Sequence, residues 1–260
     1  MAPRIESRQR MAKNNTGVRD RNLYDPESSK PYKLSRSKLE RFLECPRCFY
    51  LDRRLGVDRP DTLPFTLNVA VDELLKREFD EYRTRREPHP LVRDAGVAAI
   101  PFEHEELAKW QTNFTGIQYH HEPTNLIISG AIDDLWVDSQ GNLIVVDYKA
   151  TSTQEVITPA FNYRSGYKRQ LEIYQWLFRQ NDFVVSSTAY LVYANGRKDR
   201  PGFGGRLEFD LTLIPCVCDD GWVEQCVIDA WACLRQPRLP DANPACTYCL
   251  YRSAARERET

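Results

Sequence analysis

The chain has 260 residues, of which 42% are hydrophobic, so it is long enough to bury a sizeable core in one or two domains. Its 36 lysine and arginine residues nearly balance 37 aspartate and glutamate residues. The overall charge therefore does not indicate a nucleic-acid binder, and any basic surface must be local. The longest apolar runs are far shorter than the ~20 residues that cross a bilayer, and the arginine-rich start lacks the apolar region of a signal peptide. We therefore expect a soluble, cytoplasmic protein without a membrane partner.

The first 34 residues carry many charges and show no apolar periodicity, which predicts a mobile tail. Residues 35–260 are then expected to form a single domain. In this domain the segment 37–56 begins with Ser37 and Glu40 in the spacing of a capping box and ends at a glycine. This pattern predicts the first helix.

Helix and strand patterns alternate along the rest of the chain. The run 66–85 predicts a long helix, and its apolar spacing indicates a buried face made of Leu67, Ala70, Val71, Leu74, Leu75 and Tyr82. Further elements are expected as strands within 117–149, a helix over 167–180, strands over 184–194 and 206–214, and a helix over 222–236. This order predicts an α/β fold with a mixed central sheet flanked by helices.

Charged residues interrupt two apolar strand patterns that a short loop joins. The loop 139–141 fits a three-residue hairpin turn in which a glycine takes the left-handed conformation. In that register Asp133 lies opposite Asp147, and Lys149 shares their face because strand side chains alternate. A two-residue loop would instead place Asp134 opposite Asp147.

Two carboxylates opposed in a buried sheet repel each other unless a cation lies between them. Asp133 and Asp147, with waters and the Tyr148 carbonyl, offer the hard oxygen ligands that Mg²⁺ or Mn²⁺ prefers. Lys149 would then orient or help deprotonate an attacking water, or neutralise charge on a phosphate. The alternative is an edge hairpin with solvated charges, which the flanking apolar runs disfavour.

Three short motifs resemble the RecB-like branch of the PD-(D/E)XK nuclease superfamily. They are Gly-Ala-Ile-Asp at 130–133, Val-Asp-Tyr-Lys at 146–149, and the Q-x3-Y pattern of Gln170 and Tyr174. The resemblance implies a restriction-endonuclease-like core, and it makes the expected domain 35–260 a RecB-like nuclease domain.

The same resemblance implies roles for the motif residues. Asp133 and Asp147 would bind the catalytic metal, and Lys149 would serve the attacking water. Gln170 and Tyr174 would organise the site or the DNA strand, and their spacing puts both on one helix face. A core tyrosine with a surface glutamine is the alternative interpretation of that pair.

One element departs from the branch. Many RecB-like nucleases carry a histidine metal ligand in a G-x3-H motif on an upstream helix, whereas the corresponding stretch 68–72 places Asp72 at that position. Because magnesium prefers oxygen ligands, a carboxylate suits this role. An exposed aspartate at the helix edge is the alternative, and Glu78 on the same helix is a second candidate ligand.

Two C-x2-C pairs lie near opposite ends of the chain: Cys45 with Cys48, and Cys246 with Cys249. Four such thiolates complete a metal site that would join the segments 35–58 and 237–260. Similar CRISPR-associated and recombination nucleases hold an iron-sulfur cluster by one N-terminal and three C-terminal cysteines. The resemblance therefore implies a [4Fe-4S] cluster, and the two-plus-two division keeps structural Zn²⁺ as the alternative. The other four cysteines are expected in the core: Cys216, Cys218, Cys226 and Cys233.

The segment 33–54 carries seven lysines or arginines against three acidic residues and includes Phe49 and Tyr50. Such a segment suits attraction to a phosphate backbone and base stacking on a single strand, although a solvated helix face is the commoner case.

We therefore expect a metal-dependent DNA nuclease acting in DNA repair, recombination or CRISPR-type defence. Its DNA would have a single-stranded portion, and its protein partners would belong to those pathways. Two alternatives are a catalytically silent DNA-binding or adaptor subunit with the nuclease fold, and a metal-clipped interaction protein that binds no DNA.

Overall fold

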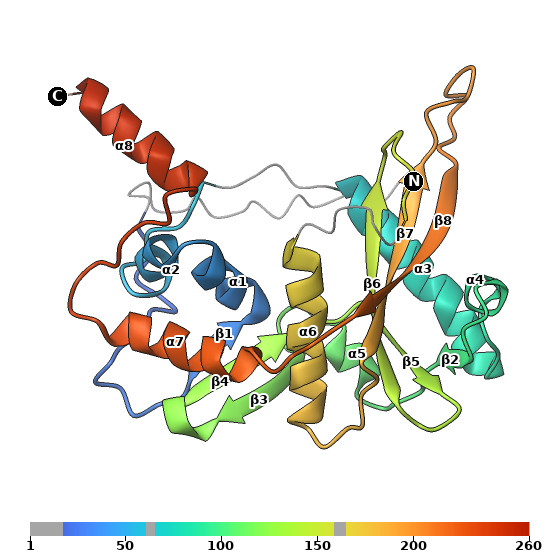
Figure 1. The fold of residues 1–260 in the computed structure, drawn as a ribbon, viewed down its shortest axis with the longest axis horizontal. Helices are drawn as coiled ribbons and strands as arrows, with labels where there is room; N and C mark the ends of the chain where they lie inside the picture. Colours follow the sequence, from blue (N-terminus) through green and yellow to red (C-terminus); the bar gives the residue numbers. More distant parts are fainter. Residues whose placement is uncertain (1–17, 61–65, 159–164, 260) are drawn as a thin grey trace, which may run out of the picture.

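The computed structural model describes residues 18–60, 66–158 and 165–259, whose strands form two sheets (Figure 1). The smaller sheet has the order β1-β4-β3 and consists of β1 (Tyr32–Ser35), β4 (Leu126–Gly130) and β3 (Ile117–His121). The larger sheet has the order β2-β5-β6-β7-β8 and consists of β2 (Ala99–Pro101), β5 (Asp134–Asp138), β6 (Leu143–Thr151), β7 (Thr188–Gly196) and β8 (Phe209–Val217). Strands β6 and β7 are parallel and the other neighbours are antiparallel, which confirms the predicted mixed central sheet.

Helices flank both faces of the larger sheet, with α6 between the two sheets and α3 on the far side (Figure 1). The residues of β6 alternate accordingly: Val145 joins the core around α6, and Val146 joins the core around α3. The described helices are α1 (Arg36–Glu44), α2 (Pro46–Arg53), α3 (Thr66–Arg85), α4 (Pro90–Asp94), α5 (Leu107–Trp110), the 3₁₀ helix η1 (Glu122–Thr124), α6 (Ser165–Arg179), α7 (Val223–Arg235) and α8 (Thr247–Glu259). The predicted α/β fold with flanking helices is confirmed.

The predicted first helix is two helices. The chain is extended at Cys45, with a φ of −165°, and α2 begins at Pro46, whose ring suits a first helical position. The expected capping box is also wrong, because Ser37 makes no cap and Glu40 instead forms an ion pair with Arg169 of α6. The ion pair of Glu40 with Arg169 of α6 thus takes the place of the expected cap contact within α1.

Helix α3 has the predicted bounds, and its predicted buried face is right in part. Val71 and Leu75 are buried as expected, whereas Leu67 and Leu74 are 57% and 61% exposed and Ala70 is exposed too. The buried set is Val71, Leu75, Phe79 and Arg83.

The predicted tail does not extend to residue 34. Residues 1–17 lie outside the described part of the chain, but the following stretch packs on the domain. The Arg19 N–H donates to the Gly56 carbonyl at 2.9 Å, Tyr24 is 6% exposed, and β1 pairs in parallel with β4. A four-residue strand is too short to show periodicity, which explains why the sequence did not reveal it.

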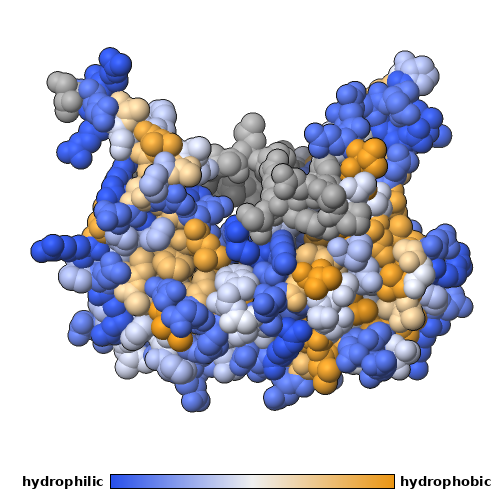
Figure 2. Space-filling model, viewed as in Figure 1, coloured by the Kyte–Doolittle hydropathy of each residue, from blue (hydrophilic) through white to orange (hydrophobic). Residues whose placement is uncertain are grey.

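Two segments project from the body on the same side, the helix α8 and the hairpin of β7 and β8 (Figure 1). Both tips are hydrophilic in Figure 2. Among the described helices, none has the length and apolar character needed to cross a membrane.

Candidate active site

The β5–β6 hairpin has the register that the three-residue loop predicted. Asp134 pairs with Val146, and the Asp138 N–H donates to the Asn142 carbonyl at 3.1 Å across the loop. Gly141 has a φ of +86°, a conformation that other residues rarely adopt. Continuing this register by one residue sets Asp133 opposite Asp147.

Asp147 lies on the face of β6 that packs toward α6, and its side chain is 1% exposed. One carboxylate oxygen, Oδ1, accepts a hydrogen bond of 2.7 Å from Gln170 Nε2. The same nitrogen lies 3.1 Å from the Tyr174 hydroxyl, to which it donates. The other oxygen, Oδ2, forms an ion pair with the Lys149 ammonium. Four predicted site residues thus form one connected group.

Asp133, the residue directly before β5, joins this group. Its Oδ2 accepts a hydrogen bond of 2.8 Å from the Tyr148 N–H, and its Oδ1 lies 3.7 Å from Lys76 Nζ. The Lys76 ammonium also lies 2.9 Å from Asp72 Oδ2, so one lysine connects both carboxylates. Sequence reasoning missed Lys76, although its position one helical turn after Asp72 marks a possible partner.

The second candidate ligand on α3 lies elsewhere. The Glu78 carboxylate is bonded to His89 Nε2 at 2.8 Å and is half exposed. Glu78 therefore serves the contact between α3 and the α4 region, and the structure does not bring it to Asp133 and Asp147. Asp72 is the acidic residue of α3 that shares a partner with the site.

Asp134 faces away from the site, so the two-residue-loop alternative is wrong. Its buried carboxylate forms an ion pair with Arg83 and accepts a hydrogen bond of 2.9 Å from the Tyr148 hydroxyl. Trp136 Nε1 donates a further bond of 3.3 Å. Asp134 is thus a buried structural anchor between the hairpin and α3.

Burial and like charge act together on Asp133. Burial first, and the neighbouring Asp147 charge second, raise the pKa of Asp133 well above its usual range. Burial lowers the pKa of Lys149, but the two carboxylates outweigh that effect and raise it overall. The Asp133 carboxylate, 23% exposed, next to the buried Asp147 carboxylate offers the oxygen ligands that suit a divalent cation.

A glycine lets α6 approach the site. A Cβ atom on Gly130 would lie 2.6 Å from Tyr174 Cε1 and 3.2 Å from Leu177 Cδ1, closer than packed atoms allow. The glycine of the Gly-Ala-Ile-Asp motif therefore has a packing role, since it sets the Tyr174 ring against β4.

A second cluster lies apart from the carboxylates, where α2 meets the C-terminal segment. The Cys48 sulfur lies 3.6 Å from Cys246 Sγ and 3.7 Å from Cys249 Sγ, and Cys45 Sγ lies 3.8 Å from Cys249 Sγ. All four sulfurs lie within 4.8 Å of one another and all four residues are buried. The predicted joining of the two ends of the domain by four cysteines is confirmed, and this donor set can bind a metal.

The family model of the PD-(D/E)XK nuclease superfamily matches residues 63–254 of the chain. The chain belongs to this superfamily. The matched segment contains the whole carboxylate site, and nucleases of this superfamily use divalent metal ions. No curated protein sequence matches the chain. A solved structure titled "Crystal structure of SSO0001" is similar to it, with 16% sequence identity, a TM-score of 0.37, and coverage of 87% of this chain and 86% of that chain.

In this superfamily member the basic segment 33–54 is not one continuous surface. Phe49 and Tyr50 are 0% and 5% exposed, so the prediction that they stack on bases is wrong. Arg47 Nε donates to the Pro240 carbonyl at 2.8 Å, which ties α2 to the C-terminal segment. The apolar residues of α2 are buried because the helix packs against α1 and α7.

The remaining cysteines are buried in the main core, as predicted: Cys216, Cys218, Cys226 and Cys233. None of the eight cysteines forms a disulfide.

Proposed function

We propose that the protein is a metal-dependent deoxyribonuclease of the RecB-like branch that hydrolyses phosphodiester bonds. One observation carries this proposal. The hairpin register brings Asp133 and Asp147 together with Lys149, and Gln170 connects this group to Tyr174. Membership of the nuclease superfamily supports the reaction class.

The carboxylates of Asp133 and Asp147 would hold Mg²⁺ or Mn²⁺, with the Tyr148 carbonyl as a further oxygen ligand. A bound divalent ion supplies Lewis-acid catalysis by polarising the phosphate and lowering the pKa of water. The Lys149 ammonium, fixed beside Asp147, would orient the attacking water and offset the negative charge that builds up on the phosphate. Asp72, connected to Asp133 through Lys76, is the proposed further ligand.

Gln170 and Tyr174 have positioning roles in this proposal. The Gln170 amide fixes Asp147 Oδ1 and the Tyr174 hydroxyl together, so the carboxylate keeps one orientation. A fixed ligand is preorganised, which reduces the reorganisation needed during the reaction. Tyr174 also borders the surface next to the site, where a DNA strand would pass.

The four cysteines would hold a structural metal. Three sulfur-to-sulfur distances of 3.6–3.8 Å, with all four sulfurs within 4.8 Å of one another, agree with the edge of a tetrahedron around one ion, about 3.8 Å for a metal–sulfur bond of about 2.3 Å. In a [4Fe-4S] cluster each thiolate binds its own iron, which sets the sulfurs further apart. This geometry favours the zinc alternative over the cluster that the family resemblance implies.

The resemblance to RecB-like nucleases supports a role in DNA repair, recombination or CRISPR-type defence, with protein partners from the same pathways. We place the activity in the cytoplasm, because none of the eight cysteines forms a disulfide.

The proposal is tested by incubating labelled single- and double-stranded DNA with anaerobically purified protein and Mg²⁺, Mn²⁺ or EDTA. We expect cleavage with either metal, none with EDTA, and loss of cleavage in Asp147→Asn. The control Lys109→Ala changes an exposed residue of α5 and keeps full activity. If the wild-type protein binds DNA but never cuts it under any metal, the nuclease proposal fails and the adaptor function replaces it.

A further inference from the structure

A groove leads away from the candidate active site along β1 and the loop 111–116. Its first part, of about 280 Å³, lies beside Ala131 and Tyr174. Its second part, of about 650 Å³, continues past Phe114 and Arg53. Three residues line both parts: Ser35, Asn113 and Ser129. The two parts are therefore continuous, and one end of the groove lies beside Tyr174 of the candidate active site.

Cations dominate the charges that line this groove: Lys30, Lys33, Arg36 and Arg53. Asp25 is the acidic residue of the lining. Within the described residues, neither Lys33 nor Arg36 forms an ion pair with a carboxylate, so their charges stay available to a ligand. Lys33 lies on the same outward face of β1 as Ser35, because strand side chains alternate and Leu34 between them is fully buried.

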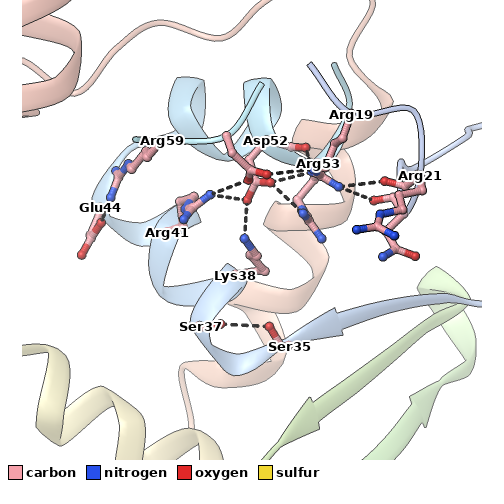
Figure 3. Close-up of polar contacts among 12 residues, drawn as sticks. Arg19, Arg21, Ser35, Ser37, Lys38, Arg41, Glu44, Asp52, Arg53 and Arg59 are labelled. Carbon is pink, nitrogen blue, oxygen red and sulfur yellow. Dashed lines mark hydrogen bonds and ion pairs between the residues drawn. The ribbon is translucent and has the colours of Figure 1, made fainter. Parts of the chain in front are cut away.

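A cluster of cations lies at the α1–α2 pair (Figure 3), and its Arg53 also lines the groove. Four of them contact the fully buried Asp52 carboxylate: Arg19, Lys38, Arg41 and Arg53. Asp58 adds a second carboxylate, 3.2 Å from Arg19 and 3.6 Å from Arg41. Four cations against two carboxylates leave an excess of positive charge. Arg53 belongs to both the cluster and the groove, and its buried Nε has no hydrogen-bond partner.

An aromatic side chain stands at the edge of the groove. Phe114 is 89% exposed, although burying such a ring is strongly favourable. The Lys33 ammonium donates to the Phe114 carbonyl at 2.9 Å and to the Thr115 carbonyl at 3.3 Å, which attaches the loop to β1. An exposed ring beside cations is the arrangement on which an unpaired base stacks.

We propose that this groove binds a single strand of DNA and directs it into the active site. Backbone phosphates lie against Lys33, Arg36 and Arg53, and one base stacks on Phe114. A duplex does not fit this arrangement, because its bases already stack on their neighbours and offer no free face to Phe114. This inference rests on the proposed nuclease function and names the form of its substrate.

The tip of the β7–β8 hairpin is the rival surface, since Phe203 is 73% exposed there among several arginines. Its charges are compensated in part, because Arg197 forms an ion pair with Asp199 at 2.7 Å and Arg200 forms one with Glu208. The groove along β1 differs from the tip in its position, since its lining includes Tyr174 of the candidate active site.

Binding of a fluorescein-labelled, mixed-sequence oligonucleotide to the full chain, followed by anisotropy in EDTA, tests the groove separately from cleavage. We expect Phe114→Ala to weaken binding by roughly five- to hundred-fold, the range of one lost stacking contact. The double variant Lys33→Gln with Arg36→Gln should weaken binding and reduce the salt slope by about 1.4, or about 0.7 per lost phosphate contact. The control Arg93→Gln removes an exposed arginine of α4 and leaves binding unchanged.

The outcomes separate the two proposals. Affinity within twofold of wild type in both groove variants overturns the groove, as does a larger loss in Phe203→Ala than in Phe114→Ala. Equal affinity for the duplex of the same sequence, or no binding of the single strand by wild type, overturns it too. If the groove variants lose binding but wild type cuts no DNA with any metal, the groove stands and the nuclease proposal fails.

Discussion

Asp147 is 1% exposed, and its Oδ2 forms an ion pair with the Lys149 ammonium. Asp133 has no such partner in contact with both its oxygens, and burial together with the Asp147 charge disfavours its ionised form. Ionised Asp133 therefore lowers the stability of the metal-free protein. Such a cost is common at functional sites and agrees with the proposed role of Asp133 as an oxygen ligand.

Asp133→Asn should stabilise the metal-free protein. Because the native pKa of Asp133 is raised, the native state loses stability as the pH rises above about 4, where the carboxyl of the unfolded chain ionises. The gain from the amide is therefore absent at low pH and grows toward neutral pH. Thermal melts in EDTA between pH 4 and 8 should show a rise in Tm of roughly 2–4 °C at neutral pH, the shift that 1 kcal/mol produces.

Asp138 in the same hairpin is the control, because its pKa is shifted in the opposite direction to that of Asp133. A hydrogen bond from Asn142 lowers the pKa of Asp138, so Asp138→Asn should not stabilise the protein as the pH rises. A lower Tm for Asp133→Asn than for wild type at neutral pH would contradict this interpretation of the buried charges.

At the scale of elements, local patterns predicted those features whose cause is local. The turn glycine fixed the β5–β6 register, and apolar spacing gave the bounds of α3. Patterns predicted the buried Val71 of α3 but also placed Leu67 and Leu74 in the core, because apolar spacing alone does not tell which turns of a helix meet a neighbouring element. They also missed the pairing of Glu40 with Arg169 and the position of Lys76, since both depend on how separate helices and strands pack.

Gly130→Ala tests the close approach of α6 to β4. The new methyl group would overlap the Tyr174 ring, and overpacking of this kind costs roughly 1–3 kcal/mol. We expect a lower Tm and reduced DNA cleavage, because the displaced Tyr174 would release Gln170 from Asp147. In Gly202→Ala the added methyl group meets no atom within 4 Å, so this control should behave as wild type. Wild-type melting and cleavage by Gly130→Ala would show that the contact does not position the site.

At the scale of the whole molecule, the cysteine cluster joins two ends of the domain. The C-x2-C spacing revealed the pairing from sequence, but it left the kind of metal open because spacing does not fix the distances between sulfurs. A metal bound by Cys45, Cys48, Cys246 and Cys249 closes a long loop and so stabilises the folded chain.

Cys246→Ser should therefore release the metal and lower the Tm by roughly 10 °C, as expected for losing a link worth about 4 kcal/mol. Elemental analysis of the wild-type protein should find about one zinc per chain, the ratio for a single four-cysteine site. Cys226→Ala, which changes a core cysteine outside the cluster, should keep the metal. Iron with inorganic sulfide in the wild-type protein would instead establish the cluster.

Single-turnover cleavage by wild type and Lys149→Ala, with labelled single-stranded DNA bound before Mg²⁺ is added, tests whether Lys149 acts in the reaction. The proposed function assigns Lys149 to the reaction and the groove to binding. It predicts unchanged DNA affinity in Lys149→Ala and a cleavage rate reduced by roughly 10²- to 10³-fold, as for loss of one transition-state contact. Cleavage by Lys149→Ala at the wild-type rate would show that the carboxylate–lysine group of β5 and β6 is not the active site.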